Sequence, residues 1–124
     1  MDPKLVGEFE EYFRACKILP DKPLHLCTWE ELDAWLSSGN YGTLAVFLLN
    51  TAARHGSLEG TRMLIKHAAA SGFLLEELFA QEQFDIIHIL IESGTFWGSA
   101  HYVLEKNKHK YEAWCIAHHI KSHA

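Results

Sequence analysis

The chain has 124 residues, of which 48% are hydrophobic and 22% are charged, a composition that is typical of a globular protein and excludes a disordered one. The formal net charge of −5 argues against nucleic-acid binding, which needs a basic surface to contact phosphates. The longest apolar runs have about six residues, whereas a helix needs roughly 20 to span a bilayer, so we expect no membrane partner.

A single domain over residues 1–124 is expected, because the chain is too short for two ordinary hydrophobic cores. The first residues are charged and lack the apolar stretch of a signal peptide. The three cysteines (Cys16, Cys27 and Cys115) are odd in number and widely spaced, which favours reduced thiols over a disulfide framework. These features predict a cytoplasmic protein, or one in a host cytosol if it is an effector secreted by another route.

The first two helices are predicted from their capping residues. Asp2 is a suitable cap, and Pro3 stands at the first helical position, where its missing N–H costs nothing. A proline-containing loop follows this helix. Thr28 and Glu31 then form a capping box, which predicts a second helix that ends near residues 39–40.

The rest of the chain predicts helices separated by short turns. We expect them over residues 41–54, 58–71, 73–80, 83–92, 96–105 and 110–120. The apolar run 86–91 is also compatible with a buried strand, but the stop at Ser93-Gly94 and the lack of a partner strand favour a helix. The sequence therefore predicts an all-α fold of about seven helices.

Four short motifs, each with an acidic residue after an apolar one, recur along the chain. They begin at Leu32, Leu58, Phe84 and Tyr111, at intervals of 26, 26 and 27 residues. Each acidic residue is expected in the first turn of a helix, where it interacts favourably with the helix dipole. Another short helix precedes each motif, so the repeating element is a helix-turn-helix pair that buries its apolar face by stacking. This predicts stacked antiparallel pairs, with an orthogonal helical bundle as the alternative.

The middle of the chain resembles ankyrin repeats. Residues 52–59 resemble the end of an ankyrin first helix with its glycine turn, and residues 84–94 resemble a second helix with its terminal glycine. Residues 23–26, Pro-Leu-His-Leu, are similar to that family's signature. The spacing is shorter than the family's period of about 33 residues, so the resemblance is to a degenerate, ankyrin-like helical repeat.

The resemblance implies a non-catalytic protein–protein interaction module, acting as a small inhibitor or adaptor that occludes or recruits one protein partner. Stacked repeats bind through the surface made by their first helices and inter-helix turns. On or beside those elements we expect partner contacts from Arg54, Glu77, Gln81, Trp97 and His101. A homo-oligomer is a further alternative, because terminal repeats need polar caps and residues 111–120 are rather apolar.

The C-terminal region contains residue types that can ligate a metal ion. Cys115 and His119 are four residues apart, which would place a thiol and an imidazole on one helical face, a spacing that can hold zinc. Further histidines in this region are His101, His109, His118 and His123. No motif spacing supplies a third and a fourth ligand, so we predict no metal and no other cofactor.

Catalysis has weak support in the sequence. The cysteines lie in apolar stripes, where a free thiol is usually inert core, and no acid in the sequence pairs with His55, His67 or His88. We therefore predict no catalytic residue. The alternatives to an interaction module are a metal- or cysteine-dependent small enzyme and a structural subunit of a larger assembly.

The sequence also contains one basic cluster and four tryptophans. The basic cluster Lys106–Lys110 is interpreted as a solvated turn between the last two helices. The four tryptophans serve either an interface or the core, because tryptophan is enriched in interface centres and also fills small cores. Trp97 follows Gly94 closely and is expected to be partly exposed.

Overall fold

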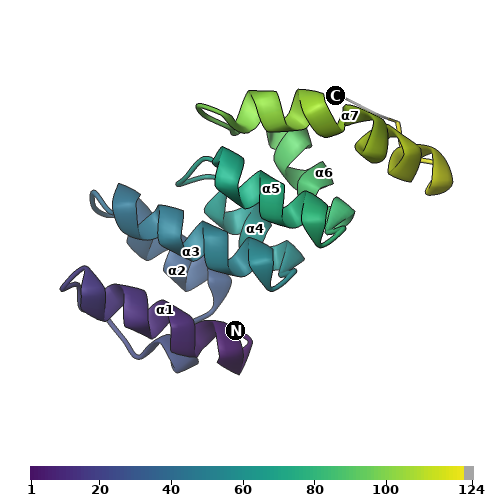
Figure 1. The fold of residues 1–124 in the computed structure, drawn as a ribbon. Coiled ribbons are helices and arrows are strands. Elements are labelled where there is room, and N and C mark those ends of the chain that lie inside the picture. The colour runs from purple at the N-terminus through teal and green to yellow at the C-terminus, as the bar shows by residue number, and fades with distance from the viewer. Residues whose placement is uncertain (122–124) are drawn as a thin grey trace. The chain divides into compact units, whose positions relative to one another are not determined.

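The computed structural model describes residues 1–121, which belong to two compact units, Met1–Ala68 and Ala69–Ala124 (Figure 1). Throughout the described residues the regular structure is helical, apart from one isolated β-bridge. The predicted all-α fold is therefore confirmed. The expectation of a single domain stays a prediction, and each unit is described here by itself.

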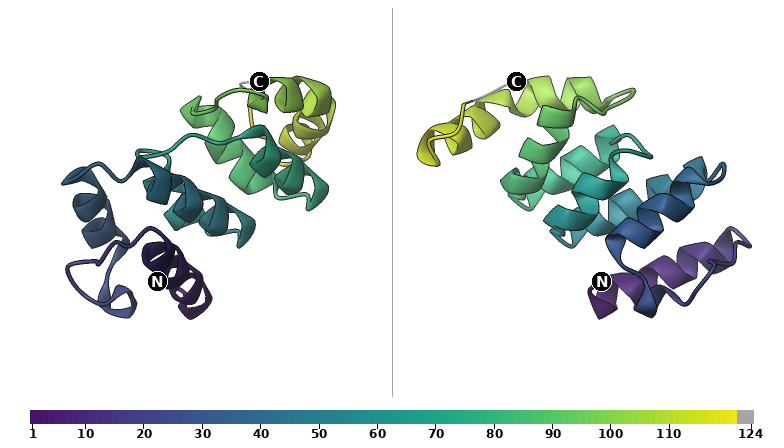
Figure 2. Two further views of the ribbon diagram at one scale, coloured as in Figure 1. Left: turned by 60° about the vertical axis from the view of Figure 1, so that its left-hand side comes forward. Right: turned by 180° about the vertical axis from the view of Figure 1, so that it is seen from behind.

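The first unit contains α1 (Pro3–Ala15), the short 3-10 helix η1 (Leu24–Leu26), α2 (Trp29–Ser37), α3 (Gly42–Arg54) and α4 (Leu58–Leu64). The second unit contains α5 (Gly72–Ala80), α6 (Phe84–Ser93) and α7 (Ala100–Ala117). Figure 2 shows these helices from two further directions.

Both predicted N-terminal caps are present in the first unit. The Asp2 side chain accepts a hydrogen bond of 2.9 Å from the backbone N–H of Lys4. The Thr28 hydroxyl accepts from the Glu31 N–H at 3.1 Å, and the Glu31 carboxylate accepts from the Thr28 N–H at 3.2 Å. The capping box therefore starts α2 as the sequence predicts.

In the first unit, α3 and α4 form an antiparallel hairpin around Gly56. This glycine has a φ of 72°, in the left-handed region that other residues rarely adopt. The Ser57 hydroxyl then caps α4 by accepting from the Gly60 N–H at 3.1 Å. This turn separates the two helices that the sequence predicts over residues 41–54 and from residue 58 onward.

The helices α2 and α4 of the first unit run parallel to each other. Trp29, at the start of α2, packs so closely on Gly60 of α4 that a Cβ at Gly60 would lie 2.7 Å from the indole ring. One turn further along α2, Asp33 contacts Lys66 and His67, which follow α4. This parallel packing places the acidic face of α2 beside the end of α4.

In the second unit, α5 and α7 also run parallel (Figure 1 and Figure 2). Gly72, at the start of α5, lies against Ser99, which precedes α7, and Glu76 forms an ion pair with Lys106 at 2.7 Å. The connection from α6 to α7 begins at Gly94, which has a φ of 64° and ends α6 where the sequence predicts.

Each unit has its own set of buried apolar side chains. In the first unit, the largest fully buried side chains are Leu5, Phe9, Leu32, Leu44, Leu48, Leu49 and Leu64. In the second unit they are Leu74, Leu75, Leu78, Ile86 and Tyr111. The acidic and basic residues of both units lie at the surface or half-buried.

Three predicted helix ranges are wrong. The helix predicted over residues 58–71 ends at Leu64, because His67 turns toward Asp33 and Ala70 pairs with the 95–97 segment. The pair predicted over 96–105 and 110–120 is one continuous helix, α7. The basic cluster Lys106–Lys110 therefore lies inside a helix and forms no turn.

The repeated motifs occupy unequal places in the structure. Glu59 and Asp85 lie in the first turns of α4 and α6, as expected. Asp33 lies beyond the first turn of α2, and Glu112 lies deep in α7, so the prediction is wrong for these two residues. Leu58, the apolar residue that begins the second motif, is 37% exposed. The resemblance to ankyrin repeats stays a prediction.

No helix within residues 1–121 combines the length and the apolar character that crossing a membrane requires.

Candidate functional site

Three aromatic side chains of the second unit are largely exposed to solvent. Phe73 in the first turn of α5 is 83% exposed, Trp97 in the connection before α7 is 56% exposed, and Tyr102 in the first turn of α7 is 67% exposed. Monomeric proteins expose single apolar side chains routinely, so a group of exposed aromatic side chains is a candidate interaction site. We call these three residues the aromatic edge.

Backbone contacts join the segments that carry the aromatic edge. The Ala70 N–H donates to the Thr95 carbonyl at 3.0 Å, and the Trp97 N–H donates to the Ala70 carbonyl at 3.2 Å. The start of α5 then passes close to the start of α7, since a Cβ at Gly72 would meet the Ser99 side chain and lie 3.2 Å from its carbonyl carbon. Backbone contacts therefore hold together the segments that carry the aromatic edge.

A hollow of about 210 Å³ lies beside the aromatic edge in the same unit. It is lined by Phe79, Ile91, Phe96, His101, Leu104, Glu105, Lys108 and Tyr111, and we call it the α7 groove. The lining residues of α7 are spaced three or four apart, so one face of this helix forms a wall of the groove. Two of the lining residues are in contact: the His101 ring stands edge-on to the Phe96 ring with a centroid distance of 5.6 Å.

The predicted contact residues are not all brought together. Trp97 belongs to the aromatic edge, and His101 lines the α7 groove. Glu77 lies in the second half of α5, and Gln81 is the residue that ends this helix. Arg54 is the last residue of α3 and lies in the first unit. The partial exposure expected for Trp97 is confirmed.

Sequence reasoning missed Phe73 and Tyr102. Phe73 stands on the opposite side of α5 from the buried Leu74, Leu75 and Leu78, so a helical projection of residues 72–80 contained a signal for its exposure. Tyr102 carried no such signal, because α7 has a weakly amphipathic pattern. Lys106 Nζ lies 5.6 Å from the centre of the Tyr102 ring, a cation–π contact on the same helix face.

The four tryptophans divide between the core and the surface. Trp29 is buried, while Trp35 and Trp114 are half-buried. Trp35 stacks on Tyr41 with a centroid distance of 4.1 Å. The core position expected for tryptophan therefore occurs at Trp29, and Trp97 is the exposed member.

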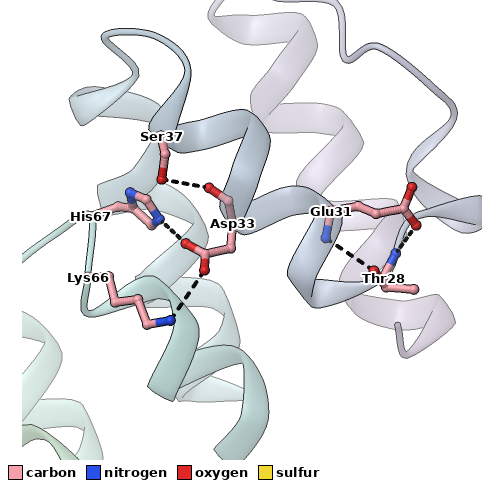
Figure 3. A network of polar contacts seen from close by, with 6 residues as sticks. All are labelled: Thr28, Glu31, Asp33, Ser37, Lys66 and His67. Carbon is pink, nitrogen blue, oxygen red and sulfur yellow. Dashed lines mark hydrogen bonds and ion pairs between the residues drawn. The ribbon is translucent and has the colours of Figure 1, made fainter.

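Polar contacts in the first unit centre on Asp33 (Figure 3). Its carboxylate is 2.6 Å from His67 Nε2 and 3.2 Å from Lys66 Nζ. The hydrogen bond from His67 is the main reason that the Asp33 pKa is lowered, with Lys66 contributing further. The Ser37 hydroxyl donates to the Asp33 carbonyl at 3.0 Å. This network joins α2 to the segment after α4.

A second polar chain runs from the buried Tyr111 to the surface of the second unit. His88 of α6 forms a hydrogen bond of 2.7 Å with the Tyr111 hydroxyl through Nδ1, and its Nε2 is 3.1 Å from the Glu92 carboxylate. Burial raises the Tyr111 pKa far above its ordinary value, and Cys115 raises it further. The phenol therefore stays protonated and is a poor proton donor to a substrate.

Three histidines pair with acids that the sequence did not indicate. His55 contacts Glu8 at 2.7 Å, and the partners of His67 and His88 are Asp33 and Glu92. The first two pairs connect residues more than 30 positions apart, which explains why the sequence gave no sign of them. Each pair joins or braces secondary-structure elements.

The proposed zinc spacing is not realised on one helix face. Cys115 is buried in α7, whereas His119 lies beyond the end of α7 with a φ of 56°. His118 and His119 are exposed, and His123 lies outside the described residues. Within residues 1–121 no group of three or more histidine, cysteine or acidic residues is placed to hold a metal ion.

Comparison of the chain with protein-family models, curated proteins and solved structures found no match. The functional argument therefore depends on the chain's own residues and geometry.

Proposed function

We propose that this protein is a non-catalytic protein–protein interaction module that binds one protein partner through the aromatic edge. The observation that carries the proposal is the exposure of Phe73, Trp97 and Tyr102 on three segments that meet in one unit. Large aromatic side chains dominate the centres of protein interfaces, because they bury much apolar area and lose few rotamers on binding.

The rigidity of this region supports a binding role. The backbone bonds between Ala70 and the 95–97 segment, together with the close packing of Gly72 on Ser99, hold the three segments before any partner arrives. A preorganised surface loses less conformational entropy on association, so more of its contact energy appears as affinity.

The repeat-like arrangement supports the same proposal. In the ankyrin-like interpretation, partners contact first helices and inter-helix segments. Two of the three residues of the aromatic edge lie on such elements, Phe73 on α5 and Trp97 on the connection before α7. Acting in the cytoplasm, a module of this size would serve as an inhibitor that occludes a partner or as an adaptor that recruits one. A catalytic role has less support, because the interior Tyr111 phenol stays protonated and Cys115 is buried.

Affinity capture with surface variants tests this proposal. The tagged chain is used to capture partners from extract of its source cells, beside a Trp97→Ala/Tyr102→Ala variant and a Leu19→Ala/Leu26→Ala control. Leu19 and Leu26 are exposed apolar residues of the first unit, at 90% and 60% exposure, so the control removes similar surface elsewhere.

The proposal predicts one partner that is retained by the native chain and by the control but lost with the Trp97/Tyr102 variant. The purified partner should then bind the variant at least about tenfold more weakly, as expected for loss of an aromatic interface centre. Equal capture by all three chains, or no captured partner, would contradict the proposal. Stoichiometric zinc in the purified chain that is lost on Cys115→Ser/His119→Ala would instead support the metal-dependent alternative.

A further inference from the structure

We infer that the α7 groove binds a partner segment that combines one large apolar side chain with a basic one. The apolar side chain would fill the hollow, and the basic group would pair with the Glu105 carboxylate. The inference rests on the proposed function, since it specifies the chemistry of the segment that the partner presents next to the aromatic edge.

The floor of the groove is suited to an apolar side chain. It is lined by Phe79 of α5, Ile91 of α6 and Leu104 of α7, and by Phe96 of the connection between α6 and α7. Three helices and this connection therefore contribute apolar atoms. An apolar cavity of about 150 Å³ accommodates benzene, and the hollow of about 210 Å³ is somewhat larger. It can therefore take the side chain of one phenylalanine or leucine.

The negative charge of Glu105 in the groove wall favours a basic side chain beside the apolar one. The two lysines nearest to Glu105 in α7 already have acidic partners: Lys106 is 2.7 Å from Glu76, and Lys108 is 4.0 Å from Glu112. Glu105 itself is exposed and forms no ion pair with any residue of the described chain. An ammonium or guanidinium group of a partner can therefore pair with the Glu105 carboxylate without displacing another cation.

The charge of the whole unit acts in the same direction. Residues 69–124 contain seven acidic and four basic residues, so the surroundings of the groove attract a basic segment and repel an acidic one. His101 also lines the groove, and its ring is held edge-on against Phe96, which leaves Glu105 as the acidic residue of the lining.

Matched synthetic peptides test the inference on the full chain. Four helical peptides share an alanine- and glutamine-rich background and differ at two positions one turn apart: Phe with Lys, Phe with Glu, Phe with Gln, and Ala with Lys. Binding is followed by ¹⁵N–¹H correlation spectra during titration, which give both the affinity and the residues contacted.

The Phe/Lys peptide is expected to bind tighter than the Phe/Glu peptide by about a factor of five, the scale of one exposed ion pair. Its binding should shift the resonances of Leu104, Glu105 and Lys108, and the Ala/Lys peptide should not bind. Glu105→Lys should reverse the preference, so that the Phe/Glu peptide binds this variant best. Glu82→Lys is the matched control, because it changes the net charge equally at an exposed residue that does not line the groove.

Equal binding of the Phe/Lys and Phe/Glu peptides, shifts confined to residues outside the groove, or no binding of any peptide at about 1 mM would overturn the inference. If a captured partner still depends on Trp97 and Tyr102 in that case, the proposed function stands and only the partner chemistry is wrong. If peptides occupy the groove while capture is insensitive to Trp97 and Tyr102, the proposed function is wrong.

Discussion

The side chains of His88 and Tyr111 are joined by a hydrogen bond of 2.7 Å that ties α6 to α7 inside the second unit. Tyr111 is fully buried and also lines the α7 groove. The bond therefore fixes α7, whose preceding turns carry Leu104 and Glu105. A partly buried hydrogen bond of this kind sets the register of two helices more strictly than apolar packing alone. The geometry of the groove therefore depends on the pairing of His88 with Tyr111.

Tyr111→Phe should destabilise the second unit by about 1 kcal/mol, because it removes the hydroxyl and leaves His88 Nδ1 without its partner. Hydrogen exchange of α6 and α7 amides measures the free energy of opening in this unit. Tyr102→Phe is the matched control, since the Tyr102 side chain is largely exposed. Equal protection in the two variants would show that the His88–Tyr111 bond contributes nothing to stability.

Stability should also decline at alkaline pH because of Tyr111. Its pKa is raised in the folded state by burial, whereas in the unfolded chain it titrates near its ordinary value of about 10. Above that pH the unfolded state loses a proton that the folded state keeps, so the free energy of unfolding falls as the pH rises.

Urea denaturation at two pH values, about 8.5 and about 10.5, measures this loss against the ordinary tyrosine value. Tyr111→Phe has no phenol at this position, so its stability should decline less over the same interval. Parallel decline of the native chain and this variant would mean that Tyr111 ionises as easily in the folded state as in the unfolded one.

Asp33 should contribute to the acid sensitivity of the first unit. Its pKa is lowered, first by the hydrogen bond from His67 and then by Lys66, so the folded state binds a proton less readily than the unfolded chain does. The stabilisation is present above the ordinary aspartate value of about 3.9 and is lost as the pH falls through the lowered folded value.

Asp33→Asn should therefore cost about 1 kcal/mol at pH 7 and flatten the acid limb of the stability curve. Urea denaturation followed through amide resonances of α2 and α4 measures both effects. Asp21→Asn, at an exposed loop position, is the control and should leave the acid limb unchanged. An unchanged acid limb in Asp33→Asn would refute the assigned role of the His67 bond.

Two glycine substitutions should change stability in opposite directions. A Cβ at Gly60 would lie 2.7 Å from the buried Trp29 ring and 2.8 Å from Ser57 Oγ, so Gly60→Ala should destabilise the chain by about 1–3 kcal/mol despite the better helix propensity of alanine. Gly7 lies in the exposed face of α1 with no atom within 4 Å of such a Cβ. Gly7→Ala should therefore stabilise it by about 0.5–1 kcal/mol.

Thermal denaturation of both variants beside the native chain provides the comparison. If Gly60→Ala raises the melting temperature as Gly7→Ala does, then α2 and α4 are not packed as closely as the structure shows.

The sequence predicted the elements whose ends have local chemical signals. These signals act within a few residues of a helix end, so they can be recognised without knowledge of the fold. They are the caps at Asp2 and at Thr28 with Glu31, and the glycines Gly56 and Gly94 that end helices. The all-α class followed from the same signals and from apolar spacing.

The wrong helix ranges arose where distant contacts decide the structure. Residues 65–70 include good helix formers, yet α4 ends before them because His67 and Ala70 are bound by residues far away in the chain. In α7, the polar run around Asn107 predicted a turn, but the Asn107 side chain donates to the Val103 carbonyl at 2.9 Å and is buried. No glycine or proline interrupts this run to stop the helix.

The candidate site was predictable only in part, for the same reason. The exposure of Trp97 followed from its place after a helix stop. That Phe73 and Tyr102 accompany it depends on the pairing of Ala70 with the 95–97 segment, and no residue pattern within either segment predicts that pairing.

Site-specific photocrosslinking in the source cells tests the interaction account most directly. A photoreactive phenylalanine, p-benzoylphenylalanine, replaces Tyr102 in one chain and the exposed Leu26 of the first unit in another. The account predicts one crosslinked protein partner from position 102 and none from position 26, with loss of the crosslink when Trp97→Ala is added. A partner crosslinked from position 26 but not from position 102, or a crosslink at 102 that survives Trp97→Ala undiminished, would contradict it.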